Sequence, residues 1–225
     1  MPADAAADQA QPRRSVYGND GVQFISEQGI AAPLMMDNVD TDVIAPIGKP
    51  PYPGVTPETR AFEPIRFFSD GTEKPDFILN QEGFRRASII IAGKNFGTGS
   101  SRPVAVSRPL DGGIRVVIAE SFGPLFYDNS IRQGLLAVPL PEVQIESLAA
   151  WAFANTGQEI KVDLESQTIE VPGMETIPFQ VEPRVREKLL NGYTVNEELS
   201  RLASEIDAFE SEYQTTRPWV YETSD

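Results

Sequence analysis

One segment combines glycine, serine and arginine in a way that suits anion binding: Gly97-Thr98-Gly99-Ser100-Ser101-Arg102. Two glycines let a backbone approach a ligand closely, and serines at the start of a helix leave N–H groups that point at an anion. Pro103 fits the first turn of such a helix. The guanidinium of Arg102 matches a carboxylate or phosphate. The segment therefore predicts an oxyanion site, although a purely structural loop with a helix cap explains the six residues equally well.

The same segment lacks the features of the common nucleotide-binding loops. No Lys stands before the serine, as a Walker loop requires, and the third glycine of the dinucleotide fingerprint is absent. A different anion is therefore the expected ligand.

Two further groups of residues carry side chains that suit chemistry. Asp40-Thr41-Asp42 precedes a short apolar run. An Asx-turn is the commoner role for such residues, and the functional alternative displays a carboxylate and a hydroxyl beside a substrate. Arg60 follows a proline-rich loop near residues 46–58. It either clamps a distal carboxylate or is an ordinary surface arginine, and the second interpretation is the commoner one.

Composition excludes several classes of function. The chain has 225 residues, 40% of them apolar, and a net charge of −14 from 19 Lys and Arg against 33 Asp and Glu. Such a surface repels nucleic acid and anionic membranes, so neither is expected as a partner. The chain contains no Cys and no His, which removes thiolate ligands and the usual general base. Chemistry then depends on carboxylates, hydroxyls, Lys, Arg, backbone dipoles or a second chain.

The elements around the glycine-rich loop follow an α/β pattern. Apolar β-branched runs at 87–92 and 114–119 predict strands buried on both faces, and residues 121–133 predict a helix that Gly134 ends. This order, in which a strand, a crossover, a second strand, a helix and a third strand follow one another, predicts a mostly parallel central sheet. The other expected elements are a strand at 135–138, a helix at 143–154, a hairpin at 159–164 and 168–171, a strand at 177–181, a helix at 184–190, and an amphipathic helix at 197–214 with Leu199, Leu202, Ile206, Phe209 and Tyr213 on its apolar face.

We expect one domain over residues 21–195, between a disordered extension at 1–20 and an acidic helical tail at 196–225. Nothing approaches the roughly 20 apolar residues of a membrane span. Met1 to Gln11 does not resemble a secretory signal, so a cytoplasmic location is the expectation.

Several stretches carry a resemblance to a known family: Asn38–Pro46, Pro75–Asn80, Asn95–Arg102, Gly113–Ala119, Ser121-Phe122, Phe126-Tyr127, Asn129 and Gly134–Leu136. Together they resemble the small subunit of 3-isopropylmalate dehydratase (isopropylmalate isomerase), which corresponds to the swivel domain of aconitase. Their order and spacing are similar to that family from about residue 29 to 192.

The resemblance implies a three-layer swivel domain and a hydro-lyase of leucine biosynthesis, which moves a hydroxyl between adjacent carbons of a dicarboxylic acid. It implies that Ser100 removes the carbon-bound proton and that Asp42 is the active-site aspartate. Gly99, Ser101 and Arg102 would bind the substrate carboxylate, with Asp40 and Thr41 beside them. It also implies a large partner subunit, in a heterodimer or heterotetramer, that carries a [4Fe–4S] cluster and the catalytic histidines.

The sequence departs from the family at two positions after the arginine, where Pro103-Val104 replaces the usual Glu-His, and at Thr98, which replaces the usual Cys. Three interpretations follow. We favour an isopropylmalate isomerase small subunit. The alternatives are a paralogue acting on another small diacid, such as homoaconitate, citraconate or a dimethylmalate-like compound, and a non-catalytic binding or assembly protein on the same fold.

Overall fold

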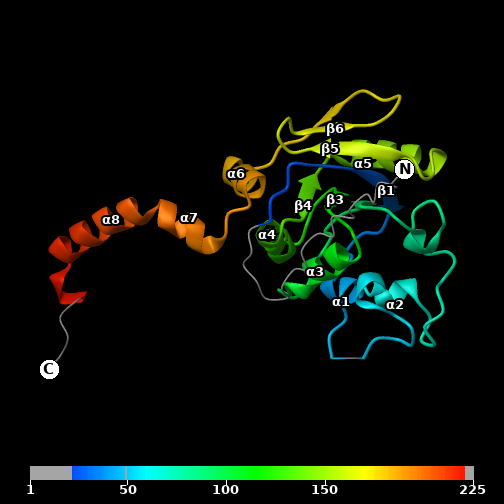
Figure 1. Cartoon of the computed structure of the whole chain (residues 1–225), viewed down its shortest axis with the longest axis horizontal. Helices are drawn as coiled ribbons and strands as arrows, with labels where there is room; N and C mark the ends of the chain where they lie inside the picture. The colour runs from blue at the N-terminus through cyan, green and yellow to red at the C-terminus, as the bar shows by residue number, and fades with distance from the viewer. Residues whose placement is uncertain (1–21, 49, 221–225) are drawn as a thin grey trace, which may run out of the picture.

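The computed structural model describes residues 22–48 and 50–220, and the extension expected at residues 1–20 lies outside them. Its centre is a seven-stranded sheet with the strand order β4-β3-β2-β1-β5-β6-β7 (Figure 1). The strands are β1 Ser26–Leu34, β2 Ile89–Ala92, β3 Val116–Ala119, β4 Leu136–Pro139, β5 Glu159–Asp163, β6 Thr168–Glu170 and β7 Ile177–Pro178. Together with the helices, this sheet confirms the α/β class.

Strands β1 to β4 form the parallel part of the sheet. Every residue of β2 and β3 is buried, which explains why both strands are continuous apolar runs. Each begins two residues later than its predicted range, because the preceding residues form turns: Ala87 donates its N–H to Phe84 O, and Ile114 donates to Pro109 O.

Strands β5 and β6 form the expected hairpin, with Lys161 opposite Glu170 and Asp163 opposite Thr168. Strand β5 runs antiparallel to the N-terminal half of β1, from Ser26 to Ile30. The C-terminal half of β1, from Ala31 to Leu34, pairs with β2 instead. Strand β1 therefore joins the parallel and antiparallel parts of one sheet.

Two hydrophobic cores lie on opposite faces of the sheet, as the alternation along β2 shows. Ile89 and Ile91 belong to the core that includes helix α5 (Glu142–Ala154) and the hairpin. Ile90 and Ala92 belong to the core that includes helices α1 (Thr41–Ile44) and α3 (Val104–Asp111) and the start of α4 (Pro124–Gln133). Short elements complete this second layer: the 3-10 turns Pro57–Thr59 and Ile78–Asn80 and helix α2 (Glu63–Arg66). The arrangement confirms the three-layer swivel architecture.

Helix α3 contains Pro109, which is buried, and continues to Asp111. The C-terminal region differs from the sequence expectation. The tail forms two helices, α7 (Val195–Arg201) and α8 (Ala203–Thr216), where one had been expected. The break is at Leu202, whose N–H is shared between Leu199 O and Ser200 O at φ −93° and ψ 1°.

Helix α6 (Pro183–Asn191) precedes this tail and ends at Gly192, which has a φ of 65°. A final 3-10 turn covers Pro218–Val220. No helix within the described residues combines the length and apolarity of a membrane span. The division into a domain at 21–195 and a tail at 196–225 stays a prediction.

Candidate functional site

Two of the three predicted groups, Asp40-Thr41-Asp42 and the glycine-rich loop, meet where the parallel strands end. The connections after β1, β2 and β3 lie side by side, because bridges extend the sheet past the named strands. Asp40 pairs with Thr98, and Phe96 pairs with Phe122. The sheet thereby brings residues about 60 positions apart in the sequence to one edge, which is the usual place for a ligand in a parallel α/β sheet.

Backbone hydrogen bonds hold the glycine-rich loop on both sides. On the β1 side, Thr41 donates its N–H to Thr98 O at 2.9 Å, and Gly97 donates to Val39 O at 2.7 Å. On the β3 side, Phe96 donates to Ser121 O at 2.9 Å, and Gly123 donates to Phe96 O at 2.8 Å. The start of the loop is therefore an ordered extension of β2.

A pair of asparagines ties the first two connections together. Asn38 and Asn95 both adopt left-handed backbone angles, with φ values of 54° and 55°. The Asn95 side chain donates to Asn38 Oδ1 at 2.9 Å, while the Asn95 N–H donates to Ser121 Oγ at 2.9 Å. No role for either asparagine is predicted from the sequence. The available signal was the residue type, since Asn tolerates the left-handed region better than most residues do.

Gly97 fits against an aromatic cluster beneath the loop. Its φ is 73°, and a Cβ at this position would lie within 2.5 Å of Phe126 Cβ and Cδ2. Phe126 is buried and packs edge-on against Phe96 with ring centroids 5.3 Å apart. A glycine is therefore required both by the backbone angle and by the close approach of the ring.

The Asp40-Thr41-Asp42 group divides into structural and exposed residues. Asp40 Oδ1 accepts the N–H groups of Asp42 and Val43, each at 2.8 Å, and so caps α1. Thr41 is buried beneath Gly99. Only the Asp42 carboxylate is directed toward solvent, where it forms an ion pair with Arg102. The expected turn is therefore present at Asp40 and an exposed carboxylate at Asp42, whereas the Thr41 hydroxyl is not displayed because Thr41 is buried.

Ser100 and Ser101 are exposed beside this ion pair. Within the described part of the chain, the N–H groups of Gly99, Ser100 and Ser101 contact no acceptor. The expectation that the serines cap a helix is wrong, because α3 begins at Val104 and Pro103 occupies its N-cap position. The loop nevertheless presents three unpaired donors, two hydroxyls and one guanidinium to solvent, which is a donor set suited to a carboxylate.

Two other ionisable groups near the loop are unsuited to act as bases. The carboxylates of Glu120 and then Glu142, each 3.7 Å from Lys94 Nζ, raise the pKa of that ammonium group. Burial raises the pKa of Tyr127, which lies 6.0 Å from Phe122 between ring centroids. Lys94 therefore stays protonated with its charge compensated, and the Tyr127 phenol stays neutral.

Arg60 is held in the segment that covers the second core. Its Nε donates to Glu63 Oε2 at 3.0 Å, and Glu63 Oε1 accepts the Tyr52 N–H at 2.6 Å. The Glu63 carboxylate is buried and fastens the proline-rich loop at both ends. The structure shows this scaffold role for Arg60, and a role in substrate binding stays a prediction.

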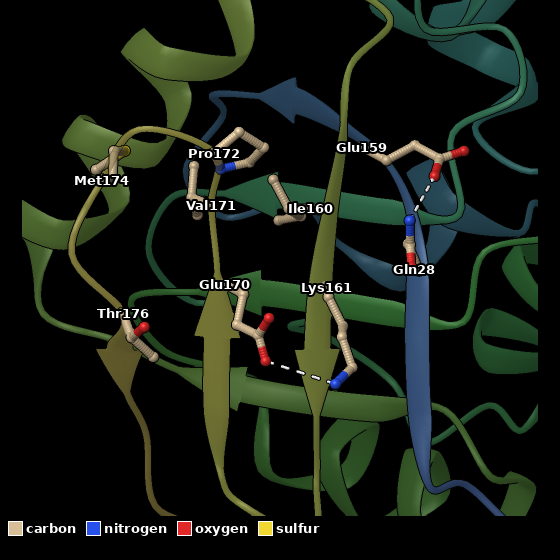
Figure 2. Close-up of a pocket in the computed structure, with 9 residues that line it drawn as sticks. All are labelled: Gln28, Glu159, Ile160, Lys161, Glu170, Val171, Pro172, Met174 and Thr176. Atoms are coloured by element: carbon tan, nitrogen blue, oxygen red, sulfur yellow. Dashed lines mark hydrogen bonds and ion pairs between the residues drawn. The ribbon is translucent and has the colours of Figure 1, made fainter.

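A hollow lies beside the hairpin of β5 and β6, and it is lined by residues of β1, of the hairpin and of the segment that follows β6 (Figure 2). Its one cation, Lys161, forms ion pairs with Asp163 at 3.1 Å and with Glu170 at 3.5 Å. Gln28 opposite donates to Glu159. With its positive charge already compensated, this hollow is poorly suited to an acidic substrate.

Comparison with known proteins identifies the family of this chain. Family models match the chain at residues 59–143, for the aconitase C-terminal domain, and at 146–183, for LeuD_N. A 3-isopropylmalate dehydratase small subunit from Rhodospirillum centenum is 45% identical over 202 residues, covering 88% of this chain and 98% of that protein. The chain belongs to the 3-isopropylmalate dehydratase small-subunit family.

Other members of this family support the assignment. The small subunit from Dinoroseobacter shibae is 41% identical, with 88% of this chain and 99% of that protein covered. A crystal structure of 3-isopropylmalate dehydratase from Methanocaldococcus jannaschii superimposes with a TM-score of 0.56 and 28% identity, covering 82% of this chain and 99% of that one. Members of this family therefore have this fold and align with most of this chain.

A metal cluster does not fit the residues of this small-subunit family member. The sequence has no Cys, and the described residues include no group of three or more His, Cys, Asp or Glu side chains placed to hold a metal. An iron–sulfur cluster is normally held by Cys thiolates. This chain therefore supplies no thiolate ligand for such a cluster.

Proposed function

We propose that this chain is the small subunit of a 3-isopropylmalate dehydratase, which interconverts 2-isopropylmalate and 3-isopropylmalate by dehydration and rehydration in leucine biosynthesis. One observation carries the proposal: a chain that spans 98% of a relative with that name also brings Ser100, Arg102 and Asp42 to the edge of the sheet where parallel strands end. The comparisons do not favour the paralogue or the non-catalytic interpretation. A cytoplasmic location is part of the proposal.

The partner in this proposal is a large subunit, in a heterodimer or heterotetramer, that carries a [4Fe–4S] cluster and covers the glycine-rich loop. The cluster would supply Lewis acidity toward the substrate hydroxyl and carboxylate. The need for a cover follows from exposure. Ser100 and Ser101 face solvent in the isolated chain, whereas electrostatic stabilisation of a charged transition state is strong only when water is excluded.

Ser100 is proposed as the base that takes the proton from the substrate carbon. A serine hydroxyl is a poor base near neutral pH, so its alkoxide requires stabilisation by fixed donors. The unpaired N–H groups of Gly99, Ser100 and Ser101 and the guanidinium of Arg102 supply such donors. Proton loss from one carbon and departure of hydroxide from the next leave an alkene and water, and addition in the opposite sense gives the isomer.

Ser101 and Arg102 are proposed to bind a substrate carboxylate, and Asp42 to orient Arg102. Because the ion pair holds the guanidinium against the α1 connection, the remaining N–H groups of Arg102 are presented in one direction. Asp40 and Thr41 contribute by fixing α1, since the first caps that helix and the second is buried under the loop. Arg60 is the weakest of the proposed substrate contacts, because Glu63 already binds it.

The test is co-expression with the large subunit from the same organism and an anaerobic assay with 2-isopropylmalate and a panel of other substituted malates. We expect turnover of isopropylmalate, and a loss of about 10²- to 10⁴-fold for Ser100→Ala with the complex intact. Ser147→Ala, an exposed serine on α5, is the matched control. Full activity of Ser100→Ala would refute the base assignment. Turnover of another diacid in place of isopropylmalate would refute the substrate.

A further inference from the structure

The tail carries an apolar stripe that the body of the chain leaves uncovered. Leu202, Ile206 and Phe209 are 42%, 39% and 62% exposed, and Leu199 before them is 52% exposed. A shallow groove along α8 is lined by Leu202, Ile206, Phe209 and Tyr213 together with the flanking Glu205 and Glu210. An exposed apolar stripe of this kind marks an interaction site, because a soluble helix obtains most of its stability by packing such a face.

The body of the chain is not the occupant of the groove. Figure 1 shows α7 and α8 extending away from the sheet and its covering helices. The root of the tail is fixed in that direction. Thr194 and Glu197 form a capping box at the start of α7. Arg201 forms an ion pair with Glu187 of α6 at 3.1 Å, and its guanidinium lies over the Tyr193 ring.

A second copy of the chain is a poor occupant because of charge. Helix α8 carries Glu205, Asp207, Glu210 and Glu212 and no Lys or Arg. Pairing two such helices through their grooves would bring Glu205 and Glu210 of both copies, four carboxylates, to one interface, and like charges at an interface are costly. The groove instead suits a partner whose apolar surface is bordered by Lys or Arg.

The place where the tail leaves the body points to the same partner that covers the active site. Helix α6, from which the tail extends, packs against α4. Helix α4 in turn contacts the start of the glycine-rich loop, where Phe126 lies under Gly97, and the residue that follows the loop, where Gln133 donates to Pro103 O at 2.8 Å. One partner lying over the loop and past α4 would therefore reach the tail.

We propose that the stripe of Leu202, Ile206, Phe209 and Tyr213 docks into an apolar, basic-rimmed groove on the large subunit, as a contact separate from the active-site interface. The inference rests on the proposed function, since it uses the same partner. Two contacts joined by one rigid chain bind more tightly than either alone, because the second contact forms at a high effective concentration. The tail would thus hold the subunits together, while the loop supplies chemistry.

The experiment measures the Kd of the full-length chain for the large subunit from the same organism. It also measures turnover of isopropylmalate when the chain is present at a concentration that saturates the large subunit. The stripe variant is Leu202→Gln, Ile206→Gln, Phe209→Gln. The control is Ser204→Gln, Ala208→Gln, Ser211→Gln, on the opposite side of the helix. We expect the stripe variant to raise the Kd about 100-fold, because apolar anchors dominate interface energy, with kcat retained at saturation. The control should bind like the unmodified chain. Glu205→Lys with Glu210→Lys should also weaken binding, and less so at high salt.

Three results would overturn the inference. Equal Kd values for the stripe and control variants would show that the tail does not contact the large subunit. A dimer of the isolated chain in sedimentation that the stripe variant abolishes, with an unchanged Kd for the large subunit, would identify a second copy as the occupant. If the unmodified chain binds no large subunit, the proposed function fails as well. If it binds and turns over isopropylmalate but the stripe is neutral, only the docking inference fails.

Discussion

Replacement of Gly97 by alanine tests whether the glycine-rich loop is held as tightly as its contacts indicate. The new methyl group would lie within 2.5 Å of Phe126, whose ring is buried between Phe96 and Phe122. The Gly97 N–H is bonded to Val39 O, so the loop cannot move away freely. Either the ring or the loop must shift, and Ser100 lies three residues further along.

The expected cost has two parts. A left-handed φ of 73° costs a non-glycine residue about 1–2 kcal/mol. Forcing a methyl group into the packed aromatic cluster costs about 1–3 kcal/mol more. The sum of about 2–5 kcal/mol is a large fraction of the 5–15 kcal/mol typical for a whole domain. Gly113 separates the two parts, because its φ is 88° but a Cβ there would meet no atom within 4 Å.

Urea unfolding of the isolated chain measures both variants. We expect Gly113→Ala to lose about 1–2 kcal/mol of unfolding free energy, and Gly97→Ala to lose about 1–3 kcal/mol more than that. In the assembled enzyme, Gly97→Ala should also reduce kcat, since a displacement of about 1 Å in a catalytic group costs on the order of 10²-fold. Equal stability of the two alanine variants would refute the reasoning, because the Phe126 contact would then have no energetic effect.

Three further predictions concern the residues around the loop. Asp42→Asn keeps the side-chain shape but releases Arg102, so we expect a higher KM for the diacid. The loss of unfolding free energy should be small, because the ion pair is partly exposed. An unchanged KM would show that Asp42 does not orient Arg102. Asn95→Gly keeps the left-handed backbone and removes the hydrogen bond to Asn38. We therefore expect kcat to fall, while the free energy of unfolding in urea changes by about 1 kcal/mol. Restoration of kcat in Asn95→Asp would contradict a role for the amide donor. The hydrogen bond from Arg85 lowers the pKa of Glu73 below its usual 4.5, so the stability from this pair is present above that pH and is lost as the pH falls through the lowered value. Thermal unfolding of Glu73→Gln should therefore depend less on pH below about 4.5 than that of the unmodified chain.

Strands β2, β3 and β4 and the hairpin were predictable because each depends on a local pattern. Strands buried on both faces must be apolar throughout, so β2 and β3 are visible as continuous runs. The hairpin alternates because β5 has one covered face. Gly134 and Gly192 end α4 and α6 with positive φ values, as glycine allows. These signals are contained within about ten residues and do not depend on the rest of the fold.

Contacts between distant segments were not predictable in the same way. The aspartate group and the glycine-rich loop are about 60 residues apart, and nothing in either segment specifies the bridge between Asp40 and Thr98. The Asn38–Asn95 bond has the same origin, since it requires two parallel strands to end side by side. The break at Leu202 was also missed. The helical spacing of the apolar residues in the tail continues through this break. Such periodicity alone does not reveal where a helix tightens its last turn.

The replacement of Glu-His by Pro103-Val104 is accommodated without disturbing the ion pair at the loop. Val104 is partly buried and packs against the core that contains α1 and α3, where an apolar side chain needs no partner. Pro103 has no N–H to satisfy at the helix start, and its carbonyl accepts the side chain of Gln133. Arg102 and Asp42 remain paired directly before these residues. The departure therefore alters the first turn of α3 and leaves the exposed donors of Gly99 to Arg102 intact. It is for this reason compatible with an isopropylmalate-type reaction.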